Sequence, residues 1–352
     1  MARNADRRAR KNRSKTPRFG TGIAVRDLER YPTWLETAER AGFDLLTTGD
    51  SQSLWAEPFV SMTLAAQVTT RPDLAITVSN PMTRHPAVVA SACLALQQLS
   101  GGRFRYGIAS GDSALRNIGT RPARTDELEA YVCAVQALCR GEEAEWGGRS
   151  FGVHWHQAPT PVWIAAEGPR TQELAGRIAD GVILSNCLAP PMREVALENI
   201  RRGCEAAGRR FEDLEIWYMC NLVPAQSEAD GIESVKAILG GTANHVYRFH
   251  MDGKGVPEEV KPKIAKLKRR YDSRHHASPA SAAHNAALVE ELGLVEFLAP
   301  LGTIAGPPER LVERLREVVA SGATNLILSQ FVEDEIRFMD LLARTVLPAV
   351  RS

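Results

Sequence analysis

The sequence of 352 residues lacks a long hydrophobic run and an excess of either charge. No apolar stretch approaches the ~20 residues that a transmembrane helix needs, and the N-terminus lacks the apolar core of a secretory signal. The 43 Lys and Arg residues are balanced by 42 Asp and Glu residues, which argues against a nucleic-acid-binding protein judged from overall charge. We therefore expect a cytoplasmic protein with no membrane and no nucleic acid as its partner.

Paired cysteines and metal-ligand motifs are also missing. The six cysteines lie far apart, form no C-x-x-C motif and mostly fall within apolar periodic segments, which predicts reduced packing residues. The stretches "HWH" (154–156) and "RHH" (274–276) have no carboxylate or cysteine at a zinc-binding spacing. We therefore expect no metal site.

Basic residues are concentrated at the N-terminus. Residues 1–18 carry eight basic residues and one acid, without an apolar period. This composition predicts a disordered, solvated tail, and the alternative is a tether to nucleic acid or to an anionic surface. The remaining residues, 19–352, are predicted to form one domain.

Short apolar runs alternate with helical patterns through most of the chain. Three consecutive runs end at Asp50, Asn80 and Gly111, which are 30 and 31 residues apart, the length of one β-α unit each. The runs are nearly continuous in apolar residues, as expected for parallel strands covered on both faces. The eight predicted strands are 19–25, 44–50, 74–80, 104–112, 161–169, 181–186, 214–225 and 324–330.

Eight β-α units predict an α/β fold of the (β/α)8 TIM-barrel type. Two segments exceed a plain barrel and are predicted as insertions, at about 140–160 and, between strands seven and eight, at about 226–300. The alternative is a doubly wound sheet, which does not need eight units and usually shows a Gly-rich fingerprint at its first turn. The stretch "GTGIAV" (20–25) lies inside the first strand and so does not fit that motif.

The predicted strand ends carry small, polar and Gly-rich segments. In a TIM barrel the chemistry takes place at the C-terminal ends of the strands. Few strong acids or bases and no metal-ligand set are found there, which suits a bulky, flat cofactor held by hydrogen bonds. These residues are Asp50, Ser51, Ser79, Asn80, Ser110, Gly111, Asp112, Glu167, Gly168, Ser185, Asn186 and Ser329.

Several of these residues fall within motifs that identify a family. The motifs are "TTGDSQSLWAEPFVSMTLAAQVT" (47–69), "TVSNPMTRHPAVVA" (77–90), "LSGGRFRYGIASGDSALRNIGTRPA" (99–123), "WIAAEGPRTQELAGRIADGVILSN" (163–186) and "GPPERLVERLREVVASGATNLIL" (306–328). In these motifs the chain resembles the bacterial luciferase-like superfamily of flavin- and deazaflavin-dependent oxidoreductases, and it is most similar to the branch that includes methylenetetrahydromethanopterin reductase. The motifs are specific for the superfamily and weak on the reaction.

The resemblance implies a site at the barrel mouth, with the cofactor ring lying across it. Thr77-Val78 aligns with a non-prolyl cis peptide that supports the back of the ring in several members. Asn80, at the same strand end, is also expected to contact the cofactor. The alternative is an ordinary strand end followed by a turn at Asn80-Pro81. The 226–300 insertion would be a lid and part of a dimer contact, so a homodimer is expected.

Two further strand ends receive cofactor-binding roles from this comparison. Ser110 and Gly111 would contact the cofactor, Gly111 by allowing close approach of the backbone. At the fifth strand, the backbone amides at a helix start would bind the cofactor phosphate. That segment consists of Ala166, Glu167, Gly168 and Pro169.

The candidate proton donors are Asp50, Ser51 and Asp112. Deazaflavin dehydrogenases of the superfamily often have Asp-His where this chain has Asp50-Ser51, so proton transfer by that histidine is in doubt here. Asp112 would bond to the ring or substrate or donate a proton, and the alternative is a helix cap. Trp55 and Asn186 are the expected substrate contacts; Trp55 is equally a candidate packing residue.

The expected function is transfer of a hydride to or from a small organic substrate by coenzyme F-420, a deazaflavin. The alternative is a monooxygenase that uses O2 and reduced FMN, with a flavin reductase as partner. A non-catalytic binding protein on this scaffold is a third interpretation. The intact glycines 111 and 168 argue against it, because loss of activity would tolerate bulkier residues there.

Overall fold

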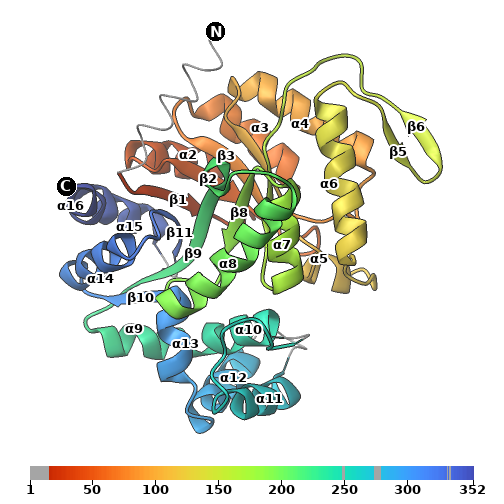
Figure 1. Ribbon diagram of the computed structural model, residues 1–352. Coiled ribbons are helices and arrows are strands. Elements are labelled where there is room, and N and C mark those ends of the chain that lie inside the picture. Colours follow the sequence, from red (N-terminus) through yellow and green to blue (C-terminus); the bar gives the residue numbers. More distant parts are fainter. Residues whose placement is uncertain (1–15, 248–249, 273–278, 331, 333) are drawn as a thin grey trace.

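The computed structural model describes residues 16–247, 250–272, 279–330, 332 and 334–352. Eight parallel strands form a closed barrel, in which β1 pairs with β2 and β11 and the ring closes between β8 and β9 (Figure 1). The TIM-barrel prediction is confirmed. The barrel strands are β1 (Arg18–Gly22), β2 (Leu45–Thr48), β3 (Asp73–Ser79), β4 (Phe104–Ile108), β7 (Val162–Ala165), β8 (Gly181–Leu184), β9 (Glu215–Pro224) and β11 (Asn325–Gln330).

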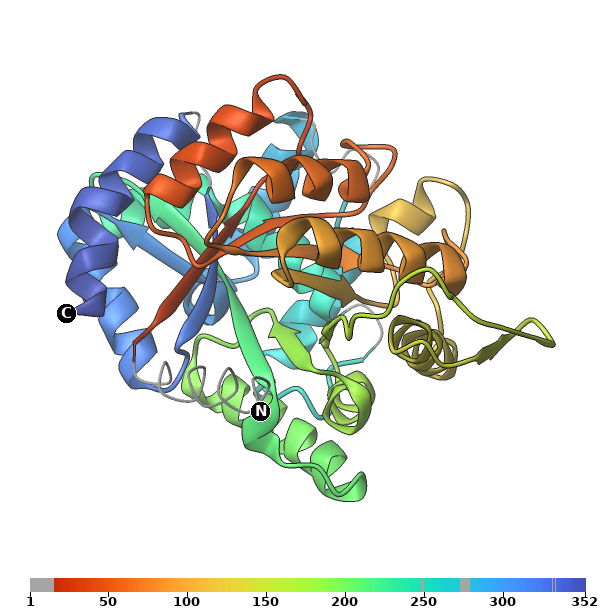
Figure 2. The same cartoon turned by 90° about the horizontal axis from the view of Figure 1, so that it is seen from above.

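Helices surround the barrel, as the view from above in Figure 2 shows. Several of them begin with Pro in the first turn, where its missing N–H leaves no bond unmade. The surrounding helices are α2 (Tyr31–Arg40), α3 (Pro58–Val68), α4 (Pro86–Ser100), α6 (Thr125–Cys139), α7 (Pro169–Ile178), α8 (Pro190–Ala206), α14 (Pro308–Ala320), α15 (Glu335–Leu341) and α16 (Leu347–Arg351). Shorter pieces are α5 (Ser113–Arg116), a 3₁₀ turn (Phe211–Asp213) and a π-helical turn (Leu342–Val346).

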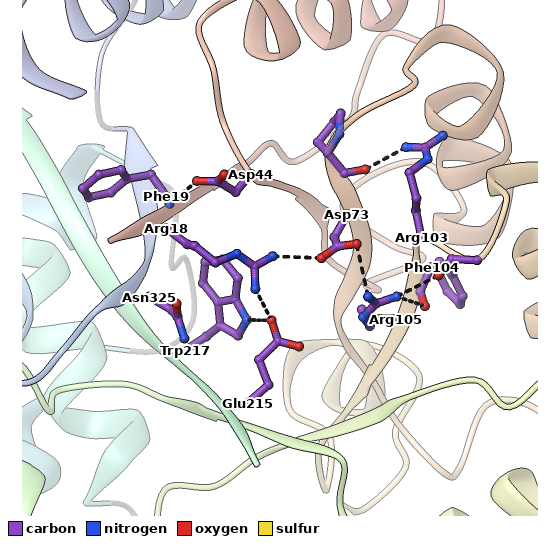
Figure 3. Close-up of polar contacts among 12 residues, drawn as sticks. Arg18, Phe19, Asp44, Asp73, Arg103, Phe104, Arg105, Glu215, Trp217 and Asn325 are labelled. Carbon is purple, nitrogen blue, oxygen red and sulfur yellow. Dashed lines mark hydrogen bonds and ion pairs between the residues drawn. The ribbon is translucent and has the colours of Figure 1, made fainter. Parts of the chain in front are cut away.

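The barrel interior is filled by apolar side chains, including the fully buried Trp163 and Trp217. Below them, an ion-pair cluster occupies the N-terminal ends of the strands (Figure 3). The Arg18 guanidinium is 2.8 Å from Asp73 and 2.5 Å from Glu215. Asp73 also pairs with Arg105 at 3.1 Å. These contacts tie β1, β3, β4 and β9 together at the bottom of the barrel.

Arg18 is therefore a barrel residue, which corrects the predicted extent of the basic tail. It is the first residue of β1 and pairs with Asn325 of β11 in the sheet register. The charge of Arg18 suggested a tail, but two acids distant in sequence neutralise it. The predicted tail residues 1–15 lie outside the described residues.

The predicted insertion between β9 and β11 is helical and has its own apolar core. It contains α9 (Glu228–Ser234), α10 (Lys236–Val246), α11 (Lys261–Arg270), α12 (Pro279–Glu291) and α13 (Val295–Gly302). In Figure 1, α10 to α13 form a group at the lower edge of the barrel. The chain returns through β10 (Thr303–Gly306), which pairs with the end of β9. This short strand was not predicted, because four residues ending in Gly carry too little pattern.

The 140–160 insertion contains a hairpin of β5 (Ala144–Trp146) and β6 (Arg149–Phe151). Gly147 and Gly148 both have positive φ in its two-residue turn, which suits glycine. In the described part of the chain, no group of His, Cys, Asp and Glu is arranged to hold a metal ion; residues 274–276 lie outside that part. None of the described helices is both long and apolar enough to cross a membrane.

Candidate active site

A cavity of about 920 Å³ opens at the C-terminal ends of the barrel strands. Its volume falls in the range of cofactor and substrate pockets. Ten of the predicted site residues line it: Asp50, Trp55, Thr77, Val78, Asn80, Ser110, Gly111, Asp112, Glu167 and Gly168. The α10 helix and the residues after it add His245, Val246, His250 and Lys254. The cavity therefore lies between the barrel mouth and the insertion.

One wall of the cavity is an irregularity in β3. The Thr77-Val78 peptide is cis, which is one of the two alternatives that the sequence left open, and the pairing of β3 with β4 shifts between Ile76 and Ser79. The neighbouring β4 residue is Gly107, where a Cβ would lie 2.3 Å from the carbonyl oxygen of Ile76. Only glycine leaves room for the two backbones to approach this closely.

Asp50, at the end of β2, is held by its neighbours. Its carboxylate accepts a hydrogen bond of 2.6 Å from Ser79 Oγ and forms an ion pair with Arg84, which also pairs with Glu57 at 2.8 Å. Burial alone would lower the pKa of Arg84. The hydrogen bond to Asp50 and the negative charges of Asp50 and Glu57 outweigh this effect, so the pKa of Arg84 is raised. The arrangement uses Asp50 as a fixed acceptor at the cavity wall.

Of the two predicted site residues that follow Asp50 in the sequence, Trp55 lines the cavity and Ser51 does not. The buried Nε1 of Trp55 has no hydrogen-bond partner among the residues that the structure describes. Ser51 is buried outside the cavity lining, with its Oγ 3.1 Å from Ser113 Oγ. Ser51 therefore connects the loop after β2 to α5 and does not face the cavity.

Gly111 and Asp112 follow β4 at the cavity rim. Gly111 has φ +97°, and a Cβ there would lie 2.4 Å from Leu115 Cδ1. Its need for glycine thus comes from the backbone conformation and from packing against Leu115. Asp112 precedes α5, but its side chain makes no capping hydrogen bond. Its Oδ2 is 2.7 Å from His245 Nδ1 and its Oδ1 is 2.8 Å from Arg116.

The segment after β7 brings a helix N-terminus to the cavity. Gly168 is the N-cap of α7, and no side chain of the described residues caps this helix. The side chains of Lys254 and His250 lie beside this glycine. A Cβ atom placed on Gly168 would be 3.4 Å from Lys254 Cε and 3.7 Å from His250 Cε1. Ala166 and Pro169 are not among the lining residues; the Ala166 carbonyl instead accepts a hydrogen bond from Gln172.

Comparisons of this chain with known protein families, sequences and structures identify its family. The family described as "Luciferase-like monooxygenase" matches residues 10–325. The chain belongs to the luciferase-like family. The 5,10-methylenetetrahydromethanopterin reductase of Methanopyrus kandleri is 26% identical over 345 residues, which cover 89% of this chain and 93% of the relative. The F-420-dependent glucose-6-phosphate dehydrogenase of Beutenbergia cavernae is also 26% identical, over 94% of this chain and 95% of the relative.

Solved structures share the luciferase-like fold over almost the whole chain. The coenzyme F-420-dependent tetrahydromethanopterin reductase from Methanopyrus kandleri has a TM-score of 0.74 at 21% identity, covering 95% of this chain and 99% of that chain. A monooxygenase from Streptomyces bottropensis has a TM-score of 0.65 at 18% identity, covering 94% and 99%. These two structures show only that the fold is shared. The family match and the relatives confirm the resemblance inferred from the motifs.

Asn186 lies beside the main cavity of this luciferase-like chain, not in its lining. It adjoins a smaller cavity of about 20 Å³ together with Cys187 and Tyr247. Asn186 has φ +54°, and within the described part of the chain its buried Nδ2 has no hydrogen-bond partner. Its position at a strand end suggested a substrate contact, but the backbone turns this residue toward the insertion. There its Oδ1 is close to Gly302, at 3.0 Å from the position that a Cβ atom would take on that glycine.

The sequence-based prediction missed the basic and imidazole groups of the cavity. His245, His250 and Lys254 come from the insertion, and Arg124 and Arg170 follow the strand-end loops. None of them stands at a strand end, so the pattern of the barrel did not point to them. Two cysteines near the barrel mouth and core are poor nucleophiles, since burial raises the pKa of Cys187 above its usual value and that of Cys220 to about 12.

Proposed function

We propose that this luciferase-like protein is an oxidoreductase that uses coenzyme F-420 for hydride transfer to or from a small organic substrate. The relatives named above are a reductase and an F-420-dependent dehydrogenase. The observation that supports the proposal most is the cavity, which is large, lies at the strand ends and includes the cationic side chains of Arg124, Arg170 and Lys254 in its lining.

The residues present fit an anionic, flat cofactor. The uncapped N-terminus of α7, with Lys254 and His250 beside Gly168, would hold the phosphate, because amide N–H groups and cations attract anions. Thr77 and Val78 would support the ring at the opposite wall. Bound there, the deazaflavin would supply or accept the hydride. The chain's own residues would position the substrate, exclude water and move the proton.

The alternative is an FMN-dependent monooxygenase. The description of the family, "Luciferase-like monooxygenase", favours it. The same walls would hold FMN, reduced by a separate flavin reductase, and O2 would be the second substrate. The strand-end residues are compatible with both cofactors.

Titration of the purified chain with oxidised F-420 and with FMN, followed by fluorescence, tests the proposal. We expect F-420 to bind more tightly, and the Lys254→Met variant to bind it at least about tenfold more weakly because one cationic contact is lost. Lys266→Met is the matched control, because Lys266 is exposed on α11 and outside the cavity lining. Preference for FMN, with O2-dependent oxidation of reduced FMN, would establish the alternative instead. Binding of neither cofactor would favour a non-catalytic protein.

We also infer that the chain forms a homodimer. The support is a set of exposed apolar side chains in and near α3 and α4: Leu54, Val60, Met82 and Val88. Burying such side chains against a second copy would remove apolar surface from water. Light scattering should give twice the mass of one chain, and a double Val60→Lys, Val88→Lys variant should shift toward the monomer; a wild-type monomer would contradict the inference.

A further inference from the structure

A histidine of the insertion and an aspartate of the barrel meet at the cavity. His245 lies in the last turn of α10, and Asp112 follows β4. The Nδ1 atom of His245 is 2.7 Å from Oδ2 of Asp112, and both residues line the cavity. The two residues are 133 positions apart. The pair therefore forms only when the insertion folds over the barrel mouth.

The Asp112 carboxylate is engaged at both oxygens. Oδ1 pairs with Arg116 at 2.8 Å, while Oδ2 faces His245. An acid in such a position is a poor proton donor, because its protonation would disrupt an ion pair and a hydrogen bond. Asp112 is better suited to fix the ring of His245 than to carry a proton.

His245 has the features of a proton carrier. An imidazole that donates Nδ1–H to a carboxylate has a fixed tautomer, and Nε2 remains to exchange a proton. In the described part of the chain, no residue is hydrogen-bonded to His245 Nε2. The side chain is 40% exposed, so it can be reprotonated by water.

Other candidates in the site are less suitable. Asp50 is paired with Arg84 and Ser79. Ser51 is buried outside the cavity lining. His250 lines the cavity, but its Nδ1 faces the backbone carbonyl of Asp252 at 3.3 Å instead of a carboxylate.

We propose that His245 is the catalytic acid and base of this site and that Asp112 is its positioning residue. The proposal rests on the proposed function. During reduction, the hydride supplied by the reduced deazaflavin forms a C–H bond at a substrate C=O, C=N or C=C carbon. Protonated His245 donates the proton on Nε2 to the other atom of that double bond. The π electron pair of the double bond forms the new bond to this proton. The imidazole would regain its proton from water, which would also take up the proton that the cofactor loses on oxidation. The reverse reaction uses Nε2 as the base.

A pH profile of this site reflects several charged neighbours of His245. Asp112 and Arg116 face it from the segment after β4. Lys254 Nζ bonds the carbonyl of the adjacent Val246, and His250 and Glu167 line the same cavity. The test therefore needs a signal from the His245 ring itself.

The first measurement is a set of proton–nitrogen correlation spectra of the histidine rings, in the full chain with and without oxidised F-420. The resonance missing in His245→Gln assigns the ring. We expect wild-type His245 to be protonated at Nδ1 at high pH, and the Asp112→Asn variant to lose this fixed tautomer. An unchanged His245 ring in Asp112→Asn would overturn the positioning role.

The second measurement is single-turnover oxidation of bound reduced F-420 by menadione, a quinone hydride acceptor, across pH. We expect His245→Gln to keep wild-type affinity for F-420 and to react about 10²- to 10⁴-fold more slowly, without the pH limb that matches the ring titration. His284→Gln is the control, since His284 is exposed on α12 and its Nε2 contacts the Arg270 carbonyl.

The outcomes separate the two proposals. If wild type binds and oxidises reduced F-420 while His245→Gln keeps the rate and the pH limb, the role of His245 is wrong and the proposed function stands. If wild type binds no F-420, the proposed function fails, and the hydride step assigned to His245 fails with it.

Discussion

Arg84, from the loop after β3, forms a salt bridge with Asp50, which lies just after the end of β2. Asp50 is almost completely buried, and Arg84 lies 5.4 Å from the centre of the Phe59 ring. Because Arg84 also pairs with Glu57 at the start of α3, a single guanidinium fixes two loops at the rim of the cavity. The same contact that shapes the site therefore also supports the fold.

The Asp50→Asn variant should be markedly less stable. Removing one partner of a largely buried ion pair leaves Arg84 with only the more exposed Glu57 as its counter-charge, which costs up to about 3–5 kcal/mol. Urea unfolding measures this loss. Glu36→Gln is the control, since its pair with Arg40 is 4.0 Å long and exposed; we expect less than about 0.5 kcal/mol there. Equal stabilities of the two variants would show that the Arg84 contact contributes nothing.

The Arg18→Met variant should destabilise the bottom of the barrel. Burial lowers the pKa of Arg18, but Glu215 and Asp73 outweigh it and raise that pKa, so the guanidinium and both acids depend on one another. We expect a loss of about 2–4 kcal/mol, because the partly buried Glu215 loses its cation and Asp73 keeps only Arg105. Arg30→Met, at a side chain 90% exposed, should unfold at the wild-type urea concentration. A wild-type midpoint for Arg18→Met would assign the residue to the solvated tail after all.

Two glycines of the cavity wall should respond differently to alanine. At Gly107 a Cβ would lie 2.3 Å from a backbone oxygen, while at Gly168 the nearest atom is a lysine carbon at 3.4 Å. Gly107→Ala should therefore lose about 1–3 kcal/mol through forced backbone shifts, and Gly168→Ala should stay close to wild type. Thermal unfolding of both variants, with F-420 affinity measured alongside, checks this contrast. Equal melting temperatures would contradict it.

Glu335 should make stability depend on pH. Burial raises its pKa, and a hydrogen bond from Trp34 Nε1, 2.6 Å long, offsets only part of this. Because the folded state holds this proton more tightly than the unfolded state, the stabilisation is complete below the ordinary value of 4.5 and is lost as pH rises through the folded pKa. The urea midpoint of Glu335→Gln should therefore rise relative to wild type between pH 4 and 7. A difference that is constant with pH would refute this.

Much of the barrel follows from local pattern. The apolar runs ending at Asp50, Asn80 and Gly111 correspond to β2, β3 and β4. A buried parallel strand is recognisable from a short run of consecutive apolar residues, and the length of the following helix sets the distance to the next strand. The strand ends also had to meet, since parallel strands point the same way in a closed barrel. Ten of the predicted site residues line one cavity for this reason.

Side-chain direction and long-range contact were decided only in three dimensions. Ser51 is adjacent to Asp50 in sequence, yet it faces Ser113 instead of the cavity. Arg18 reads as part of a basic tail until Asp73 and Glu215, far along the chain, are placed beside it. His245 reaches Asp112 across 133 positions, through an insertion whose position no local period encodes. The sequence by itself determined the barrel and its strand ends, because their pattern is local; the tertiary structure alone decided which charges and imidazoles reach the site.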